Sequence, residues 1–568
     1  MTAIRPAGAG GGSAPRAAGG ATGAGTTGGG ATAEAHGADA PGAGGRGSGG
    51  RGVGGRGVGG RGVGGRGVGG RGVGSTARGS LFGLAGSAAN ALFGFVLVAV
   101  ITHGLGARGA GAVFTGVAAF TILSNALKLG ADTALVRFVS RDLELSGGAG
   151  VPGLLRISVL PTLLASAAGA AVLLCSPGLA GLLLPELDPG QAAALIRLFA
   201  VFLPVTTVAL VLLGATRGYG SVVPFVGVEQ IGKPALRVLL AVPLVLLAPS
   251  VAGLSVAWLA PGVPGAVAVC VSLRRSRRRH PGSGQPPSRA REFWAFAGPR
   301  AVSSVFDITA VWIGVILLSV LGTGTDAGIY TAIGRLVTAG SLLQLAIRLA
   351  VAPQISRLLA GDDAHGARRL HALSTRWIAL FSWPAFLVLA AFPRTVLSLF
   401  GPGFGGGATG LVVLAAACLV NVGVGNAQTV ILMAGRSVWN LVVAGGAFVV
   451  QLGSGIWLVP RYGVLGAAVS WGLAIVVDNG ASALLARYRL GFCTVDRGYL
   501  YAAVVGAVTV ALPVFALRAL FGDTVPGALL GIVLAIGAFC AAVWRYRLPL
   551  GVGEFFGALR KRGPGNSL

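Results

Sequence analysis

Charged and amide side chains interrupt long apolar stretches of this chain at spacings that bring them onto shared helix faces. Asn125, Lys128 and Asp132 follow one another in steps of three and four residues, so on a helix they lie on one side. Arg300 and Asp307 are seven residues apart and share a side in the same way. Cations in such surroundings suit an anionic headgroup, because a guanidinium binds phosphate oxygens through paired hydrogen bonds.

Arg335 and Arg348 belong to a later apolar stretch and stand 13 residues apart. At about 100° per residue they point in different directions, so at most one of them faces a given cavity. Each charged residue has a structural alternative, since an ion pair can join two helices and an arginine head can reach the membrane interface. The candidate binding residues are Lys128, Arg300, Arg335, Asn125 and Arg348.

Two further polar groups are better explained by helix packing. Glu229, Lys233 and Arg237 follow one another in steps of four, so the first two can neutralise each other and leave one positive charge over. Asn421 and Gln428 are seven residues apart and should lie one above the other on a single helix. For both groups we favour a local role in joining helices.

Helices that cross a membrane are the elements that must position these side chains. Between Leu81 and Leu548 the chain contains about fourteen apolar segments of roughly 20 residues, the length that spans a bilayer core as a helix. A hydrophobic content of 54%, a charged content of 11% and a mean hydropathy of +0.79 exclude a soluble globular protein of 568 residues. The segments run at about 81–103, 112–137, 154–176, 192–216, 222–248, 251–273, 293–321, 327–352, 372–393, 408–435, 437–460, 463–487, 499–519 and 526–548.

Arginines are concentrated in every second connection between these segments, which predicts an orientation. By the positive-inside rule the arginine-rich connections face the cytoplasm, and both termini then face it too. The net charge of +27 is explained by such connections lying against anionic lipid, so no nucleic-acid partner is expected. The arginines concerned are Arg137, Arg141, Arg156, Arg217, Arg274, Arg275, Arg277, Arg278, Arg279, Arg357, Arg368, Arg369, Arg376, Arg436, Arg487, Arg489 and Arg497.

Two pairs of segments repeat along the chain. AGAVFTG at 110–116 aligns with AGIYTAI at 327–333 at a shift of about 216 residues, and Ser-Arg at 140–141 then falls on Ser-Arg at 356–357. LGATRG at 213–218 matches LMAGRS at 432–437 in the same way. The repeat predicts two six-helix halves related by an axis along the membrane normal, with a cavity between them.

The expected boundaries follow from these patterns. Residues 1–78 contain almost no large apolar side chain and form a Gly/Arg-rich cytoplasmic tail, predicted to be disordered, with GGRGV repeats from Arg46. Such a tail could hold anionic headgroups or RNA, but a solvated low-complexity extension is the favoured interpretation. The other predicted parts are a first half at 79–273, a basic cytoplasmic linker at 274–292, a second half at 293–490, two additional transmembrane helices at 491–548 and a basic cytoplasmic tail at 549–568.

Signals for catalysis, metals or cofactors are lacking. The five cysteines are scattered singly on different segments without metal-ligand spacing. No GxxxxGK[ST] phosphate loop occurs. The predicted outer connections are short, whereas membrane enzymes acting on lipid-linked sugars usually carry carboxylates or arginines in a sizeable outer loop. We therefore expect no enzyme activity, no metal and no cofactor.

Seven sequence blocks carry a resemblance to other proteins. They are ITHGLGARGAGAVFTGVAAF (101–120), LKLGADTALVRFVSR (127–141), FAGPRAVSSVFD (296–307), GIYTAIGRL (328–336), AVAPQISRL (350–358), LFGPGF (399–404) and VPRYGVLGAAVSWGLA (459–474). In order and spacing they resemble the superfamily of multidrug, oligosaccharidyl-lipid and polysaccharide flippases, and within it the polysaccharide exporters. One departure concerns Asp307, because many relatives carry an aspartate a few residues later, where this chain reads TAVWIGVILL.

The resemblance implies an all-α integral membrane protein with about 14 transmembrane helices that moves a polyprenyl-pyrophosphate-linked oligosaccharide across the cytoplasmic membrane for cell-surface polysaccharide biosynthesis. Rocking of the two halves would give alternating access to a cationic cavity in which Lys128, Arg300 and Arg335 hold the pyrophosphate. Asp132 or Asp307 would carry a coupling proton or sodium ion, since a carboxylate in a dry cavity changes charge with its partner. The last two helices would form a groove for the lipid tail.

The partners implied are the lipid-linked oligosaccharide, anionic membrane lipids, and glycan polymerases or glycosyltransferases. Other functions stay open. A cation-coupled exporter of small molecules would have an acidic, aromatic-lined cavity, which the basic bias argues against, and a lipid II flippase also has about fourteen helices. A non-transporting scaffold that recruits partners through its basic tail and the 274–291 loop ranks next. An enzyme of the polymerase type ranks last.

Overall fold

The computed structural model describes residues 69–280, 290–434, 436–493 and 496–546. Within these residues the chain is helical and contains no strand, which confirms the all-α fold class. The tail residues 1–68 and the basic tail predicted at 549–568 lie outside the described residues. All of the described residues fall within one compact unit, Gly67–Leu568.

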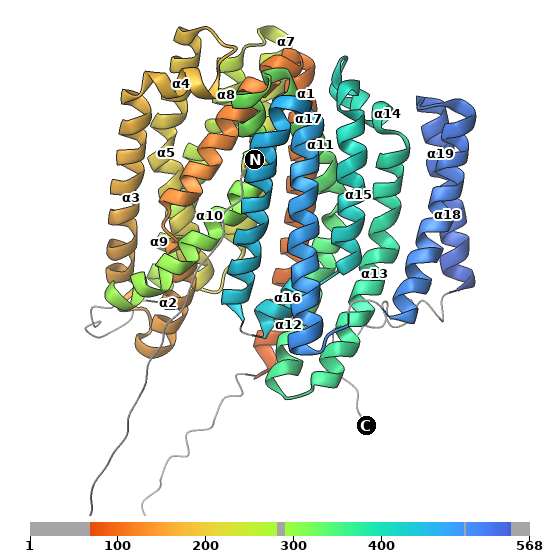
Figure 1. The fold of residues 1–568 in the computed structure, drawn as a ribbon. Coiled ribbons are helices and arrows are strands. Elements are labelled where there is room, and N and C mark those ends of the chain that lie inside the picture. The colour runs from red at the N-terminus through yellow and green to blue at the C-terminus, as the bar shows by residue number, and fades with distance from the viewer. Residues whose placement is uncertain (1–68, 281–289, 435, 494–495, 547–568) are drawn as a thin grey trace, which may run out of the picture. The chain divides into compact units, whose positions relative to one another are not determined.

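The helices follow one another as two groups and an added pair (Figure 1). The first group, here called the first half, comprises α1 (Gly69–Leu127), α2 (Ala131–Ser146), α3 (Val151–Cys175), α4 (Pro177–Leu183), α5 (Pro189–Gly218), α6 (Val223–Phe225), the π-helix η1 (Val226–Gly232), α7 (Lys233–Leu247), α8 (Val251–Leu259) and α9 (Gly262–Arg279). The second half comprises α10 (Ala290–Leu321), α11 (Gly324–Gly340), α12 (Leu342–Ala360), α13 (Ala364–Ala391), α14 (Pro393–Leu397), the short turns η2 (Ser398–Phe400) and η3 (Phe404–Gly407), α15 (Ala408–Val424), α16 (Ala427–Met433) and α17 (Ser437–Leu490). The added pair is α18 (Arg497–Phe521) and α19 (Val525–Arg545).

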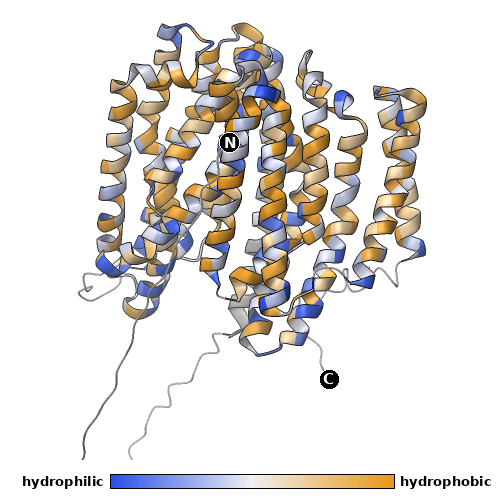
Figure 2. Cartoon of the chain, viewed as in Figure 1, coloured by the Kyte–Doolittle hydropathy of each residue, from blue (hydrophilic) through white to orange (hydrophobic). Residues whose placement is uncertain are grey.

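Eleven helical stretches are long and apolar enough to cross a membrane. Two of them are double, because α1 turns at Gly106 (φ 66°) and α17 turns at Gly463 (φ 50°), a backbone region that glycine adopts freely. The interrupted pair α11 and α12 supplies one more span. The described residues thus hold the fourteen spans that the sequence predicts. Apolar residues dominate the middle of the spans and hydrophilic residues gather toward their ends (Figure 2).

The two ends of the spans differ in charge. The end at which α9 finishes and α13 begins carries most of the arginines named above, and we call it the basic end. The end with the turns at Gly106 and Gly463 is called the opposite end.

Helices extend into two of the predicted parts. α1 begins at Gly69, inside the tail predicted at 1–78. Adding residues to an existing helix costs far less than starting one, so the apolar span extends backwards into the glycine-rich sequence. α9 continues to Arg279 and α10 begins at Ala290, both inside the linker predicted at 274–292. Arginines in the last turn of α9 are favoured by the helix dipole.

The repeated segments at 110–116 and 327–333 pack against each other near the opposite end. Gly111 of α1 and Gly328 of α11 hold equivalent places in the repeat, and a Cβ on either would lie 3.1 Å from the amide nitrogen of the other. The Cβ on Gly111 would lie 1.8 Å from the Gly324 carbonyl oxygen, and the Cβ on Gly328 would lie 2.1 Å from the Ala107 carbonyl oxygen. Helices approach this closely only where side chains are absent. A reciprocal contact is what a two-fold axis between the halves produces.

Polar contacts reinforce this packing of the two halves against each other at the opposite end. The Glu186 carboxylate, between α4 and α5, accepts from Arg108 Nε at 3.1 Å and from the Gly324 amide at 2.9 Å. The Ser319 hydroxyl of α10 donates to the Leu183 carbonyl at 2.6 Å in a buried position. The Gly324 and Ser319 contacts each join the first half to the second.

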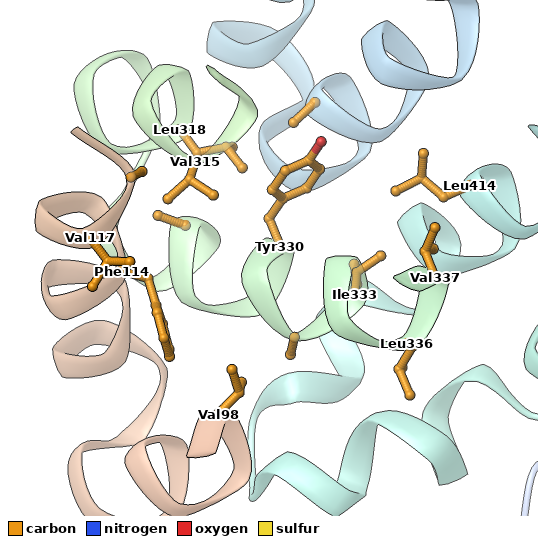
Figure 3. Close-up of a cluster of buried hydrophobic side chains, with 14 of the residues drawn as sticks. Val98, Phe114, Val117, Val315, Leu318, Tyr330, Ile333, Leu336, Val337 and Leu414 are labelled. Carbon is orange, nitrogen blue, oxygen red and sulfur yellow. The ribbon is translucent and has the colours of Figure 1, made fainter. Parts of the chain in front are cut away.

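The buried core lies where α1, α10, α11 and α15 meet (Figure 3). Phe114, Val315, Ile333 and Leu414, one from each helix, are at most 3% exposed. Tyr330 of α11 directs its ring toward α17, where it meets Trp471 edge-on. This packing holds α11 between the two halves and fixes the direction of its single charged side chain at membrane depth, Arg335.

The added pair is fastened to the second half at both ends. At the basic end the Arg376 guanidinium of α13 donates two hydrogen bonds to the Asp496 carboxylate at the start of α18. At the opposite end the Asp523 carboxylate, between α18 and α19, accepts from the amides of Arg394 and Thr395 at 2.8 and 3.0 Å. The pair is therefore joined to α13 at the basic end and to α14 at the opposite end.

The Arg376–Asp496 contact should hold α18 until the pH falls below about 4. Burial raises the pKa of the Asp496 carboxyl, but hydrogen bonds from Arg376 and the Tyr499 amide outweigh it, so the pKa lies below its usual value. A lowered carboxyl pKa stabilises the fold above the unfolded pKa, and this contribution is lost as the pH falls through the folded pKa. Asp496→Asn should loosen α18 at neutral pH and abolish its acid-dependent loosening. Hydrogen exchange in the first turn of α18 measures both, and unchanged protection in the variant would contradict the prediction.

Candidate functional site

The second span of each half is interrupted at membrane depth. Between α1 and α2 the chain leaves the helix, with positive φ at Leu129 (54°) and Gly130 (70°). Between α11 and α12 the helix is irregular only at Ser341, whose backbone stays right-handed (φ −88°, ψ −3°), and the repeat shift places Ser341 within a few residues of the first break. Interrupted spans at corresponding positions of two repeats point to a binding site. Apolar periodicity does not predict these breaks, although glycine at 130 inside an apolar span is a signal for one.

Lys128 and Asp132 lie on either side of the first break and form an ion pair. Lys128 Nζ is 3.2 Å from Asp132 Oδ2, and the side chains are 12% and 13% exposed. Arg217, at the end of α5, places its guanidinium 3.8 Å from the same carboxylate oxygen. Two cations therefore share one carboxylate and leave one positive charge. Among the described residues Asp132 Oδ1 has no hydrogen-bond partner.

Arg300 lies beside the same break on another helix. The backbone of α10 packs directly on Gly130, where a Cβ would lie 2.4 Å from the Ala297 carbonyl oxygen and 2.8 Å from the Ala301 amide nitrogen. Arg300 follows in the same turn of α10, is exposed, and donates to the Ser303 hydroxyl at 3.3 Å. The structure thus brings the turn that carries Arg300 against the loop that carries Lys128. Asn125 instead donates to the Thr121 carbonyl of its own helix at 2.9 Å.

Asp307 of α10 and Arg348 of α12 are related through a third charged side chain, Asp478 of α17. Arg300 attracts Asp307, and Asp307 is within electrostatic range of a second carboxylate, Asp478 of α17. Arg348 of α12 in turn attracts Asp478. Among the described residues Arg348 Nε and Asp478 Oδ1 are buried without a hydrogen-bond partner. Asp478 was not among the candidates, although it is the single carboxylate in the 54-residue helix α17.

Arg335 points away from both groups. Its guanidinium lies over the Trp312 ring at 5.7 Å from the centroid, and a Cβ on Gly94 of α1 would be 3.6 Å from Arg335 Nη1. Together with Trp312, Tyr330 and Trp471 it lines a small aromatic pocket. Arg335 and Arg348 do face different surroundings, as their spacing predicts.

Of the two predictions that assigned polar groups to helix packing, one is confirmed and one is wrong. Lys233 Nζ hydrogen bonds Glu229 within the π-helical turn, so the predicted neutralisation is confirmed. The stacking of Asn421 on Gln428 is wrong, because the span breaks at Gly425 (φ 69°) and places them on α15 and α16. Asn421 instead bonds the Gln344 side chain of α12 at 3.4 Å.

An apolar cavity lies beside the added pair. It has a volume of about 460 Å³ and is lined by residues of α11, α13, α18 and α19, among them Leu336, Pro384 and Phe539. Leu336 directly follows Arg335 on α11. Adjacent residues of one helix thus face the aromatic pocket and the apolar cavity. Within the described residues no group of three His, Cys, Asp or Glu side chains could hold a metal ion.

The spans and the reciprocal contact between the halves define an integral membrane protein built from two related halves. The fold is similar to that of a lipid II flippase, MurJ, in an inward closed conformation, with a TM-score of 0.63 and 13% identity over 83% of this chain and 98% of that one. An inward-facing multidrug resistance MATE family transporter of the MOP superfamily gives a TM-score of 0.59 and 16% identity, covering 71% and 94%. The MATE multidrug transporter DinF-BH gives 0.55 and 19%, covering 74% and 96%.

The sequence supplies the family. Residues 76–359 match the family described as polysaccharide biosynthesis protein, and the chain belongs to that family. No curated protein sequence matches the chain. Family and fold together describe a multi-span membrane protein of the polysaccharide biosynthesis family whose fold is similar to that of a lipid II flippase and of multidrug transporters.

Proposed function

We propose that the protein moves a polyprenyl-pyrophosphate-linked oligosaccharide from the cytoplasmic to the outer leaflet. The observation that carries this proposal is the uncompensated positive charge at the first helix break, where Lys128 and Arg217 share Asp132 and the Arg300 turn packs alongside. Cations that keep free donors at membrane depth suit a phosphate anion. The basic end is then the cytoplasmic side, with both termini there.

The headgroup and the lipid tail have separate places in this proposal. Lys128, Arg300 and Arg335 bind the pyrophosphate, the first two near the basic end and Arg335 deeper. The apolar cavity between α11 and the added pair accepts part of the polyprenyl chain, since its lining is almost entirely hydrocarbon. Its position next to Arg335 on α11 supports a route along that helix.

Transport proceeds by alternating access, with the opposite end closed in the present arrangement. Asp132 or Asp307 carries the coupling proton or sodium ion. Asp307 is exposed and lacks an ion pair within 4 Å among the described residues, whereas Asp132 is held by two cations. Asp307 is therefore the carboxylate that can exchange an ion without breaking a cluster. Glycosyltransferases that complete the lipid-linked unit and polymerases that consume it are the expected partners.

A second cargo is favoured by one observation. The solved structure with a TM-score of 0.63 is that of a lipid II flippase, and a lipid-linked peptidoglycan unit would present the same pyrophosphate to the same cations. The two cargoes differ in their sugars, so the lipid that accumulates in the absence of the protein distinguishes them.

Depletion of the protein should raise the pool of complete lipid-linked oligosaccharides and lower surface polysaccharide, because completed units cannot reach the outer leaflet. Mass spectrometry of extracted polyprenyl lipids measures the first and glycan analysis the second. The wild-type chain should restore both, and the Lys128→Ala, Arg300→Ala double variant should not. Accumulation of the peptidoglycan unit would select the second cargo, and no change in either pool would contradict both.

A further inference from the structure

A polar pocket at the opposite end lies between the two halves. It has a volume of about 370 Å³, within the range of about 300 to 1,000 Å³ that is typical of small-molecule sites. The first half supplies residues of α1 and of the connection between α4 and α5, and the second half supplies Ser319 and Gly324. One wall would be lost if the halves separated here, so the pocket belongs to the closed form of this end.

Polar side chains on the pocket wall keep hydrogen-bonding groups free. Arg108 donates from Nε to Glu186 Oε2 at 3.1 Å and from Nη2 to the Glu186 carbonyl at 2.9 Å, and its Nη1 has no acceptor among the described residues. Asp188 caps α5 through Oδ2, which accepts from the Gly190 amide at 3.1 Å, while Oδ1 has no donor in this part of the chain. Gln191 is exposed, and its side chain makes no hydrogen bond to any described residue. An entering molecule can thus meet a guanidinium nitrogen, a carboxylate oxygen and an amide.

The charge of this wall is unsuited to a phosphate or another anion. One guanidinium and two carboxylates give the pocket a formal charge of −1, and like charges repel. A metal ion is not favoured either, because no group of three His, Cys, Asp or Glu side chains within the described residues could hold one. The wall therefore favours a ligand that carries no negative charge and forms several hydrogen bonds.

A sugar residue matches this combination of groups. Leu105 and Leu187 line the pocket with hydrocarbon beside the polar side chains. A sugar ring has a hydrocarbon face that can cover the leucines, and its hydroxyl groups both donate and accept. These hydroxyl groups can donate to the free Asp188 oxygen, accept from Arg108 and do either with the Gln191 amide. A neutral saccharide is therefore the ligand class that the pocket fits.

The pocket is open to solution at the opposite end. The Arg108 side chain is 68% exposed, and Gln191 is exposed as well. Arg108 follows the turn at Gly106, and Asp188 lies in the connection between α4 and α5, so neither side chain is at membrane depth. A ligand can enter from this solution while the halves stay in contact. Under the proposed function the solution is outside the membrane, where the saccharide is present after transport.

We propose that this pocket binds a sugar residue of the exported glycan and thereby holds the opposite end closed. A ligand that binds only one form of a protein stabilises that form by an amount that rises with the ligand concentration. Glycan that accumulates outside should then slow the next opening, which is inhibition by the product. The proposal rests on the proposed function for the direction of transport and for the sugar, and it adds a second binding site and a regulation.

Thiol labelling of a reporter behind the pocket tests this effect. Thr331 of α11 is 5% exposed and does not line the pocket, so in the cysteine-free chain Thr331→Cys should become reactive when the opposite end opens. In sealed right-side-out membrane vesicles, a membrane-impermeant maleimide reaches it only from outside. The probe is the oligosaccharide released by mild acid from the polyprenyl lipids of the same cells. At ten times its dissociation constant, the labelling rate should fall about tenfold, because only the unliganded fraction can open.

One variant removes a sugar contact without disturbing the closed end. Gln191→Leu leaves the Arg108–Glu186 contact in place and removes an amide that forms no hydrogen bond to the described residues. It should raise the oligosaccharide concentration that halves the labelling rate about tenfold. Ala194→Leu is the matched control, since it adds a leucine to an exposed position of the same helix that does not line the pocket. It should leave that concentration unchanged.

The possible results separate the sugar site from the proposed function. Inorganic pyrophosphate at the same concentration should not slow labelling, since the wall repels anions. Slowing by pyrophosphate, no slowing by the oligosaccharide, or undiminished slowing in Gln191→Leu overturns the sugar site. The proposed transport stands in each of these cases, because the lipid pools of depleted cells test it without the pocket. Slowing by the oligosaccharide together with unchanged lipid pools would keep the sugar site and overturn the transport of that cargo.

Discussion

Gly328→Val is expected to prevent closure of the opposite end. The first carbon of the new side chain would lie 2.1 Å from the Ala107 carbonyl oxygen and 3.1 Å from the Gly111 amide nitrogen, and these are backbone atoms that cannot rotate away. Forcing extra methyl groups into a packed contact costs about 1 to 3 kcal/mol or more. A cost of about 1.4 kcal/mol already shifts the balance between closed and open forms tenfold, so transport should be largely lost.

Thiol labelling reports the opening directly. Ser319 is 3% exposed beside this contact, so in a cysteine-free background Ser319→Cys should react slowly with a membrane-impermeant maleimide. Adding Gly328→Val should raise the rate about tenfold. Gly334→Val is the matched control, because it lies on the same helix and a Cβ there meets nothing within 4 Å. Equal labelling in the two valine variants, at unchanged thermal stability, would disprove the role of the glycine contact.

The spans were predictable because each depends on its own residues alone. A segment of about 20 apolar residues crosses the bilayer whatever lies beside it, and the arginines in every second connection predict its orientation. The Glu229–Lys233 pair was predictable for the same reason, since residues four apart meet on one helix face. Even Gly111 and Gly328 were visible as repeat partners, although the sequence did not indicate that they touch.

The parts of the site that depend on tertiary contacts were not predictable. Arg217 shares Asp132 with Lys128 although it lies on a different span, and hydropathy assigned it only to a basic connection. Asp478 is placed by the packing of α17 against α10, and no local spacing relates it to Asp307 or Arg348. The break at Gly425 separated Asn421 from Gln428. Helix interruptions change which residues share a face, so periodicity fails at the positions that form the site.

Asp132→Asn should be strongly destabilising. The substitution keeps the shape of the side chain but removes the one negative charge that Lys128 and Arg217 share. The side chain of Lys128 is 12% exposed, that of Arg217 30% and that of Asp132 13%. Removing one partner of a largely buried ion pair leaves uncompensated charge and costs about 3 kcal/mol or more. Reversible unfolding in mixed micelles measures the loss.

A second substitution should recover much of that stability. With Lys128→Met added to Asp132→Asn, the cluster carries one positive charge again, as in the wild type, so the double variant should unfold closer to the wild type than the single one does. Glu292→Gln breaks an exposed pair with Arg141, whose side chains are 45% and 51% exposed, and should cost about 1 kcal/mol or less. If the two single substitutions cost the same, charge compensation at the helix break is not what holds Lys128 and Arg217 in place.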